Sequence, residues 1–285
     1  MKFVYVFGII IKISSSLPIA LSALLGFLAA GSRIIPHPGN MTLEFSIFLG
    51  VFFLAAGCSA LNQFQERADD QEMARTRNRP LPARKVSPAF VFHSALAMIC
   101  FGLLLLMVFQ SAVITLIGIV GLLIYNFGYT PLKSRTPFAI FFGAIAGCLP
   151  PLMGWIAGGG EIFSYSLWIG LGFAYFWQIA HFGLLLIAYS GDYEISAKSN
   201  LYKYLGKSGV VLTTLVSMFF CFFAAIQAGG NIPELIRFWI QWVQFAIIMF
   251  FLATTISSLN NYGRRFFRLW NSWLGIGILL ALAAW

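Results

Sequence analysis

The sequence predicts an all-α membrane protein with about nine transmembrane helices. Of its 285 residues, 60% are hydrophobic and 9% are charged, and its mean hydropathy is +0.86. Soluble domains average about 45–50% apolar and about 25% charged residues, so a soluble core could not hold this much apolar surface. The apolar runs do not alternate with polar residues, which favours helices over membrane-spanning strands.

Nine apolar runs define the predicted spans. Each is close to the ~20 residues that cross a hydrocarbon core. Lys12 interrupts the apolar N-terminal sequence, which then resumes, so we expect the first ten residues to form an interfacial lead-in and not a signal peptide. The predicted spans are residues 11–31, 43–65, 89–108, 112–130, 137–158, 164–189, 207–229, 235–260 and 266–285.

Basic residues predict the orientation of these spans. Most of the 18 Lys and Arg residues fall in the loops after spans 2, 4, 6 and 8, whereas the opposite loops hold only Arg33 and Arg237. Positive loops stay on the cytoplasmic side, so we expect a multi-pass protein of the inner (cytoplasmic) membrane or of an organellar inner membrane. The charged loops then face the cytoplasm or matrix. These basic loops account for the net charge of +9 without a role in binding nucleic acid, and we expect them to face anionic lipid or an anionic substrate.

The loop after span 2 also contains acids, which contribute little to orientation. In the segment "NQFQERADDQEMARTRNRP", Asn62, Glu66 and Asp70 are spaced four residues apart and would share one helix face. One amide oxygen and two carboxylates suit Mg²⁺, which completes its coordination with water and substrate phosphate oxygens. Arg75 and Arg79 follow, and arginine binds phosphate in a bidentate manner.

A second acidic loop, "SGDYEISAKSN", follows span 6 and is predicted to lie on the same membrane face. Asp192 is a candidate ligand for a second metal ion, and Lys198 is a candidate donor to the same phosphate. The two loops together therefore predict a metal-dependent diphosphate site at one end of a helical bundle.

Three blocks of the sequence resemble the UbiA superfamily of intramembrane prenyltransferases. The first segment above resembles its N-x-x-x-D/E-x-x-x-D motif, and the continuation M-x-R-T-x-x-R-P-L resembles the heme O synthase (protoheme IX farnesyltransferase) branch. Two further blocks resemble the same branch: "YTPLKSRTPFAIFFGAIAGCLPPLMGW", residues 129–155, and "FWQIAHFGLLLIAYSGDY", residues 176–193. The resemblance implies one prenyltransferase domain over residues 1–285, with a nine-helix UbiA-type bundle.

The resemblance also implies a reaction and a set of site residues. Farnesyl diphosphate would ionise with Mg²⁺ as cofactor, a vinyl group of heme B would attack, and heme O would form; heme A synthase or an oxidase-assembly factor would be a partner. The implied catalytic and metal-binding residues are Asn62, Glu66, Asp70 and Asp192. The implied diphosphate donors are Arg75, Arg79, Lys133, Arg135 and Lys198. The implied acceptor-binding residues are Tyr129, Trp177, Gln178 and His181.

Other functions stay open at this point. The chain departs from the heme branch at Ala180 and at residues 196–199, so the acceptor is alternatively an aromatic quinone precursor. A membrane terpene cyclase would use the same diphosphate site. A transporter would place charges near the midplane, often within inverted repeats, and neither feature is visible. His181 is alternatively an interior histidine that is hydrogen-bonded to Gln178 or to a neighbouring helix.

Overall fold

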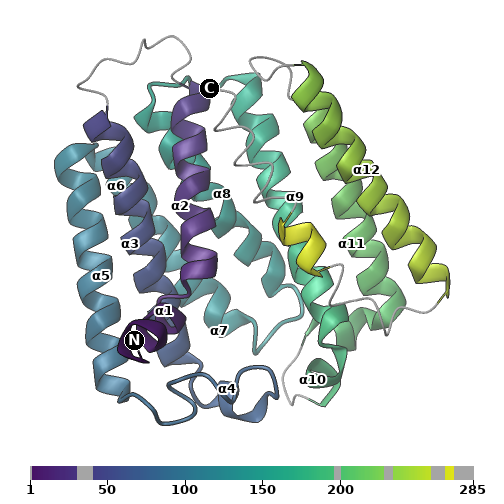
Figure 1. The fold of residues 1–285 in the computed structure, drawn as a ribbon, viewed down its shortest axis with the longest axis horizontal. Helices are drawn as coiled ribbons and strands as arrows, with labels where there is room; N and C mark the ends of the chain where they lie inside the picture. Colours follow the sequence, from purple (N-terminus) through teal and green to yellow (C-terminus); the bar gives the residue numbers. More distant parts are fainter. Residues whose placement is uncertain (1, 31–40, 196–199, 228–233, 258–266, 273–285) are drawn as a thin grey trace. The chain divides into compact units, whose positions relative to one another are not determined.

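The structure, a computed structural model, describes the chain except for residues 1, 31–40, 196–199, 228–233, 258–266 and 273–285 (Figure 1). Every regular element in the described residues is a helix, which confirms the predicted all-α class. The elements are α1 (Lys2–Ile10), α2 (Ile13–Ala30), α3 (Met41–Gln65), α4 (Asp69–Glu72), α5 (Pro88–Phe109), α6 (Ala112–Leu122), η1 (Leu123–Tyr129), α7 (Thr130–Leu132), α8 (Ala139–Ala157), α9 (Tyr165–Ala188), α10 (Ser190–Ile195), α11 (Leu201–Gln227) and α12 (Glu234–Ser257).

Seven stretches of helix in the described residues are long and apolar enough to cross a membrane. They are Ile13–Ala30, Thr42–Gln65, Pro88–Phe109, Ala112–Leu132, Ala139–Ala157, Tyr165–Ala188 and Leu201–Gln227, and they correspond to the first seven predicted spans. A shorter apolar stretch, Gln241–Phe251, lies within the predicted eighth span. The predicted ninth span lies largely outside the described residues, so the count of nine stays a prediction.

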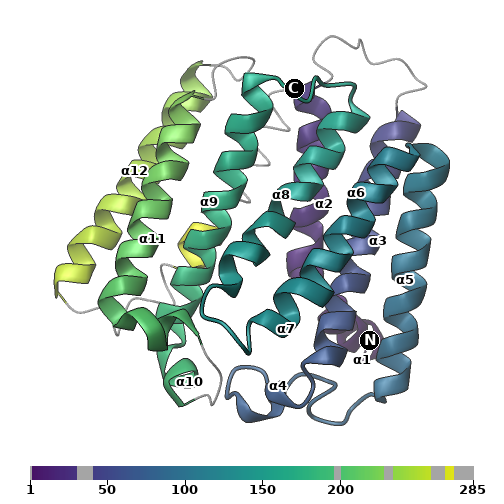
Figure 2. The ribbon, with the colours of Figure 1, turned by 180° about the vertical axis from the view of Figure 1, so that it is seen from behind.

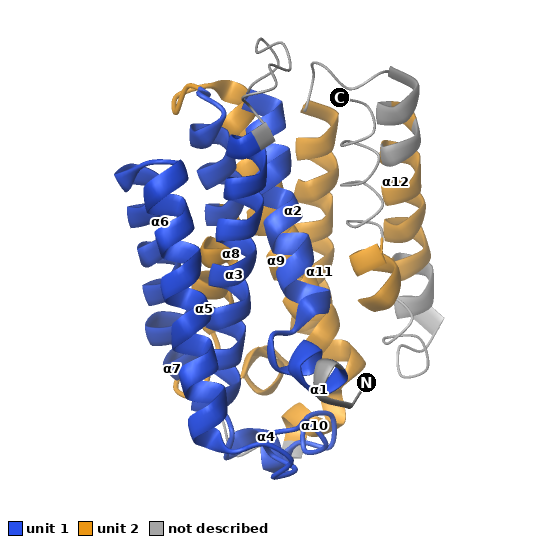
Figure 3. Cartoon of the chain, turned by 60° about the vertical axis from the view of Figure 1, so that its left-hand side comes forward, with its two compact units in different colours: residues 1–132, 149–160 blue, residues 133–148, 161–285 orange. Residues whose placement is uncertain are grey.

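The chain divides into two compact units, which Figure 3 colours separately. The first comprises residues 1–132 and 149–160, and the second comprises residues 133–148 and 161–285. The boundary between residues 148 and 149 falls inside α8, so each unit includes part of that helix. That the chain works as one prenyltransferase domain stays a prediction.

Glycines bring α3 and α5 into close contact in the first unit. A Cβ atom on Gly102 would lie 2.6 Å from the backbone nitrogen of Leu54, and one on Gly57 would lie 2.8 Å from the carbonyl oxygen of Ala95. Small residues permit such close packing of transmembrane helices, whose association does not depend on the hydrophobic effect. The helix that ends at the acidic segment is therefore packed backbone to backbone against its neighbour.

Helices α9, α11 and α12 lie side by side in the second unit, as Figures 1 and 2 show. A Cβ atom on Gly183 of α9 would overlap the side chain of Thr214 on α11, so these two helices also approach closely. The rings of Phe176 and Phe220 stack with centroids 4.4 Å apart. This packing fixes the face of α9 that bears the predicted acceptor residues.

Candidate active site

The acidic motif forms a continuous line at the end of α3. Asp70 donates its backbone N–H to the carbonyl of Glu66 at 2.8 Å, and Glu66 donates to that of Asn62 at 2.9 Å. These successive bonds to the fourth preceding residue keep the segment helical beyond the end of α3, so the three side chains share one face, as predicted. The exposed fractions of Asn62, Glu66 and Asp70 are only 2%, 7% and 5%.

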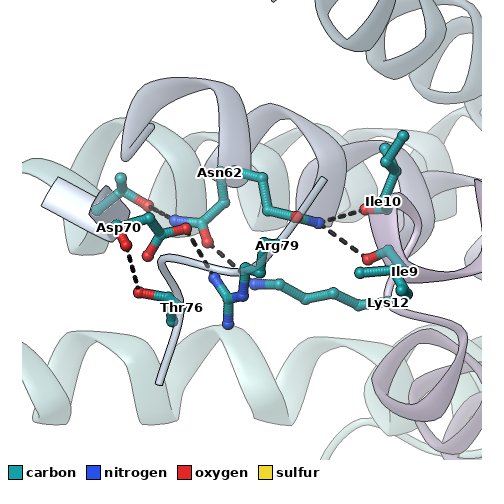
Figure 4. Close-up of polar contacts among 9 residues, drawn as sticks. Ile9, Ile10, Lys12, Asn62, Asp70, Thr76 and Arg79 are labelled. Carbon is teal, nitrogen blue, oxygen red and sulfur yellow. Dashed lines mark hydrogen bonds and ion pairs between the residues drawn. The ribbon is translucent and has the colours of Figure 1, made fainter. Parts of the chain in front are cut away.

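Two cations contact this line directly (Figure 4). The guanidinium of Arg79 donates to the Asp70 carboxylate at 2.8 Å, and the ammonium of Lys12 donates to the side-chain oxygen of Asn62 at 3.2 Å. The Thr76 hydroxyl donates to the backbone carbonyl of Asp70 at 2.9 Å. This bond stabilises the loop that brings Arg79 next to Asp70. The guanidinium of Arg79 thus offsets the buried Asp70 carboxylate, as buried charge requires.

Lys12 was missed by the sequence analysis, which treated it only as an interruption of an apolar segment. It follows the C-terminus of α1 and has a φ angle of 45°, in the left-handed region that side chains rarely adopt. The buried Gln63 donates to the carbonyls of Ile9 and Ile10 and so satisfies the end of α1. The available signal was one cation in an otherwise uncharged stretch, from residue 3 to residue 32.

A π-helix places further polar groups beside the acidic line. In η1, Asn126 is fully buried and donates to the Cys58 carbonyl at 3.0 Å and to the Gln65 side chain at 3.2 Å. Directly after η1, the Thr130 hydroxyl accepts a hydrogen bond from Asn62 at 3.1 Å. Tyr129, predicted to bind the acceptor, is buried in the same unit as the acidic line. Single-turn π-helices are frequent at functional sites.

The other predicted residues of the diphosphate and metal site fall in different parts of the chain. Arg75 is exposed in the loop after α4. Lys133, Arg135 and Asp192 belong to the second unit, where Asp192 lies in the short helix α10 and is partly exposed. Lys198 lies outside the described residues. The composite site formed from both acidic loops therefore stays a prediction.

The predicted acceptor residues lie on α9 in the second unit. Nδ1 of His181 lies 2.6 Å from the side-chain oxygen of Asn271, a residue that the sequence analysis missed. The Asn271 amide nitrogen donates to the Phe267 carbonyl at 2.6 Å, which fixes the orientation of the amide, so His181 must be the donor in its bond. In the neutral ring, Nε2 then bears the lone pair, the arrangement of a metal-ligating histidine.

Aromatic groups surround this histidine. Its ring stacks on Trp177 at 5.3 Å between centroids and lies 5.1 Å from the ring of Phe267. The indole nitrogen of Trp177 is buried and makes no hydrogen bond among the described residues, so it is a donor available to a bound acceptor. The side chain of Gln178 lies close to Gly147, and Nδ1 of His181 is hydrogen-bonded to Asn271 on another segment. His181 is thus hydrogen-bonded to a neighbouring segment, and its role toward the acceptor stays a prediction.

The donors of the acidic line fit a hard divalent cation. Two carboxylates and one amide oxygen, all largely buried, are oxygen ligands of the kind that Mg²⁺ takes when substrate phosphates complete its shell. Within the part of the chain that the structure describes, no three His, Cys, Asp or Glu side chains gather into a closed metal cluster. The chemistry suits a cation shared between protein and an anionic ligand.

Comparison with known proteins gives consistent results. The model of the UbiA prenyltransferase family matches residues 19–273. Relatives named protoheme IX farnesyltransferase include one from Geobacter sulfurreducens, 42% identical over 166 residues, which are 58% of this chain and 60% of the relative. Another, from Nitratidesulfovibrio vulgaris, is 40% identical over 136 residues, 48% of this chain and 47% of the relative. The matched regions thus span about half to three fifths of these relatives.

Two archaeal UbiA homologues of known structure share the fold. The apo structure from Aeropyrum pernix has a TM-score of 0.72 at 17% identity, covering 95% of this chain and 98% of the homologue. The homologue from Archaeoglobus fulgidus, bound to GPP and Mg²⁺, has a TM-score of 0.69 at 15% identity, covering 98% of this chain and 99% of the homologue.

Proposed function

The chain belongs to the UbiA prenyltransferase family, and from that premise we propose that it transfers a prenyl group from a prenyl diphosphate to an acceptor held in the membrane. The prenyl group is farnesyl, and the acceptor is the vinyl group of heme B. The observation that supports this most directly is the buried line of Asn62, Glu66 and Asp70 with Arg79 and Lys12 in contact.

Such a site suits the departure of diphosphate. The bond between C1 of an allylic group and its diphosphate oxygen breaks with both electrons leaving on oxygen, so negative charge develops at the phosphate end. A bound Mg²⁺ would neutralise that charge as a Lewis acid. Arg79, Lys12 and the exposed Arg75 supply donors from the protein, and such charge-assisted bonds are about twice as strong as neutral ones. Lys133, Arg135 and Lys198 complete the proposed donors, and Asp192 is the proposed ligand of a second metal ion.

The relatives and the structural neighbours support both substrates. The Archaeoglobus homologue binds GPP and Mg²⁺, which favours a metal-bound prenyl diphosphate here. The relatives are named for protoheme IX and farnesyl, which favours heme B as acceptor. We accordingly propose an inner-membrane protein with its acidic loop on the cytoplasmic or matrix side, and heme A synthase or an oxidase-assembly factor as partner.

The acceptor region offers matching chemistry. In the proposed reaction the vinyl group of heme B attacks C1 of the farnesyl group, and water adds to the resulting cation with loss of a proton, which gives heme O and diphosphate. His181, oriented by Asn271, presents Nε2 as the nitrogen for iron, and the indole N–H of Trp177 is a donor for the acceptor. Gln178 and Tyr129 complete the proposed acceptor residues.

An aromatic quinone precursor is the second candidate acceptor. Ala180 stands where the heme branch has a proline; it is fully buried, and α9 continues through it. A proline there would remove a backbone hydrogen bond and redirect the turn that bears His181. The orientation of the proposed acceptor-binding side chains on α9 therefore differs from that in the heme branch, which favours testing a smaller planar substrate alongside heme.

The test is a direct assay of the purified full chain. Farnesyl diphosphate and Mg²⁺ are supplied with heme B or with 4-hydroxybenzoate, and products are identified by mass spectrometry. We expect heme O, and we expect its formation to stop when EDTA removes the metal. Prenylated 4-hydroxybenzoate without heme O would exclude the heme acceptor while retaining prenyl transfer. No product with either acceptor would contradict the proposal.

A further inference from the structure

A pocket lies on the same loop as the acidic line. It has a volume of about 590 Å³, and it lies entirely within the first unit. None of its lining residues belongs to the proposed metal or diphosphate set. They are Arg67, Ala68, Gln71, Leu81, Arg84, Lys85, Val86, Ser87 and Pro88.

The pocket is on a different face of the segment from the acids. Arg67 and Gln71 each follow an acid of the line, Glu66 and Asp70, by one residue. Successive residues of a helical turn point about 100° apart, so these two share a face that turns away from the buried carboxylates. Their exposure agrees with this, because Arg67 and Gln71 are exposed whereas Glu66 and Asp70 are buried.

The lining is positively charged and contains no acid. Arg67 is held in place, because it donates to the Phe64 carbonyl at 2.7 Å and its guanidinium lies 4.4 Å above the Phe64 ring. Arg84 and Lys85 line the same pocket. The N-terminus of α5 opens into the same lining through Ser87 and Pro88, and its positive dipole end adds to the attraction for an anion.

The backbone holds Arg84 in a costly conformation. Its φ angle is 56°, in the left-handed region that residues other than glycine rarely adopt. The backbone N–H of Arg84 donates to the Leu81 carbonyl at 3.0 Å, and that of Lys85 donates to the Pro80 carbonyl at 2.8 Å, so a tight turn maintains the strain. The turn presents two consecutive cations at the pocket.

An apolar surface continues from the pocket along the membrane span. Helix α5 begins at Pro88 and is one of the candidate spans, so its first turn marks the edge of the apolar layer. Near that edge the ring of Phe92 lies 5.2 Å from that of Phe64, and Phe92 and Leu96 are exposed. A ligand that fits both parts has an anionic headgroup and apolar chains.

We propose that this pocket binds the phosphate headgroup of an anionic membrane phospholipid, whose acyl chains lie along Phe92 and Leu96. Basic pockets beside transmembrane helices bind anionic headgroups in this way, and each cation near the surface contributes to the affinity. The site is separate from the proposed prenyl diphosphate site, and it binds a lipid that is not consumed.

The test measures lipid binding to the purified full chain in detergent by native mass spectrometry. Phosphatidylglycerol is the probe, phosphatidylcholine with the same acyl chains is the neutral comparison, and glycerol 1-phosphate is the headgroup without chains. We expect Arg84→Gly and Lys85→Gln each to weaken phosphatidylglycerol binding about fivefold. Arg77→Gln is the matched control, because Arg77 is exposed on the same loop but does not line the pocket, and it should bind as wild type.

Arg84→Gly also separates binding from folding. Glycine relieves the left-handed strain, so the melting temperature should stay the same or rise while lipid binding falls. The KM for farnesyl diphosphate should not change. If Arg77→Gln weakened phosphatidylglycerol binding equally, or if phosphatidylcholine bound equally tightly, lipid binding would not be specific to this pocket and the proposal would be wrong. Competition by glycerol 1-phosphate as strong as by the lipid, or a raised KM in Arg84→Gly, would also overturn the proposal.

Discussion

At the scale of single residues, Asp70 combines two roles. Its carboxylate accepts from Arg79 at 2.8 Å, and its backbone carbonyl accepts from Thr76 at 2.9 Å. Asp70→Asn keeps the shape and the backbone bond but removes the negative charge. We expect prenyl transfer to fall about 10²–10³-fold, since charge stabilisation of this kind usually contributes that much.

The matched control for this change is Glu72→Gln. Glu72 belongs to the same short helix as Asp70 but is exposed, so its neutralisation alters the net charge equally without touching the buried line. Rates measured with farnesyl diphosphate at saturating Mg²⁺ should be unaffected. Full activity in Asp70→Asn, or an equal loss in both variants, would refute the assignment of the acidic line.

A second residue-scale prediction concerns the orientation of His181. Asn271→Ala removes the acceptor that fixes Nδ1 as the protonated nitrogen. Loss of the hydrogen-bond partner of a metal-ligating histidine typically weakens metal binding about 10–100-fold, so heme affinity measured by absorption titration should fall in that range. Farnesyl diphosphate binding should be retained. His93→Ala, which changes an exposed histidine, is the control; the same loss there, or none in Asn271→Ala, would count against iron ligation.

The sequence predicted the residues of the acidic line but few of their partners. Asn62, Glu66 and Asp70 follow from helical spacing, because the repeat is local. Lys12 lies 50 positions from Asn62, and Thr130 lies 68 positions from it. Asn271 lies 90 positions from His181. These pairings depend on which helices are neighbours, and hydropathy gives no information on that.

At the scale of elements, the π-helix η1 determines the register of the residues after it. Each hydrogen bond of a π-helix spans one more residue than a hydrogen bond of an α-helix. This register places the Thr130 hydroxyl where it accepts a hydrogen bond from Asn62. Deletion of Phe127 should restore α-helical turns and rotate Tyr129 and Thr130 by about 100°. We expect prenyl transfer to fall by at least about 10²-fold, because small misplacements in a site cost that much.

Phe127→Ala provides the control for this deletion. The side chain is 60% exposed, so its truncation keeps the register and removes little packing. We expect normal activity from it in the same assay. An active deletion variant would show that the position of Thr130 is unimportant.

Hydropathy predicted the first seven spans but not how they begin and end. Runs of apolar residues report where a chain can cross the membrane, and the seven long helices follow them. The break between α1 and α2 falls at Lys12, where the expected lead-in ends, whereas the π-helix was not predicted, because it lies within apolar sequence. Tertiary hydrogen bonds stabilise them: Gln63 at the end of α1, and Asn126 against α3.

At the scale of the whole molecule, the distribution of Lys and Arg predicts the sidedness of the loops. Ala74 is exposed in the loop after α4, and Phe163, between α8 and α9, is 93% exposed. In a Cys100→Ala background, Ala74→Cys should react with a membrane-impermeant maleimide only after lysis, because its loop is the positive one. Phe163→Cys should react in intact cells. The reverse pattern would invert the predicted orientation.

The glycine contacts between α3 and α5 have a consequence for biogenesis. These two helices are successive spans, and their contact needs no later part of the chain. They can therefore associate as a hairpin as soon as α5 enters the bilayer, while translation at about 5–20 residues per second is still producing the later helices. Arg79 lies in the segment between them, so its ion pair would neutralise the buried Asp70 carboxylate before the last spans leave the ribosome.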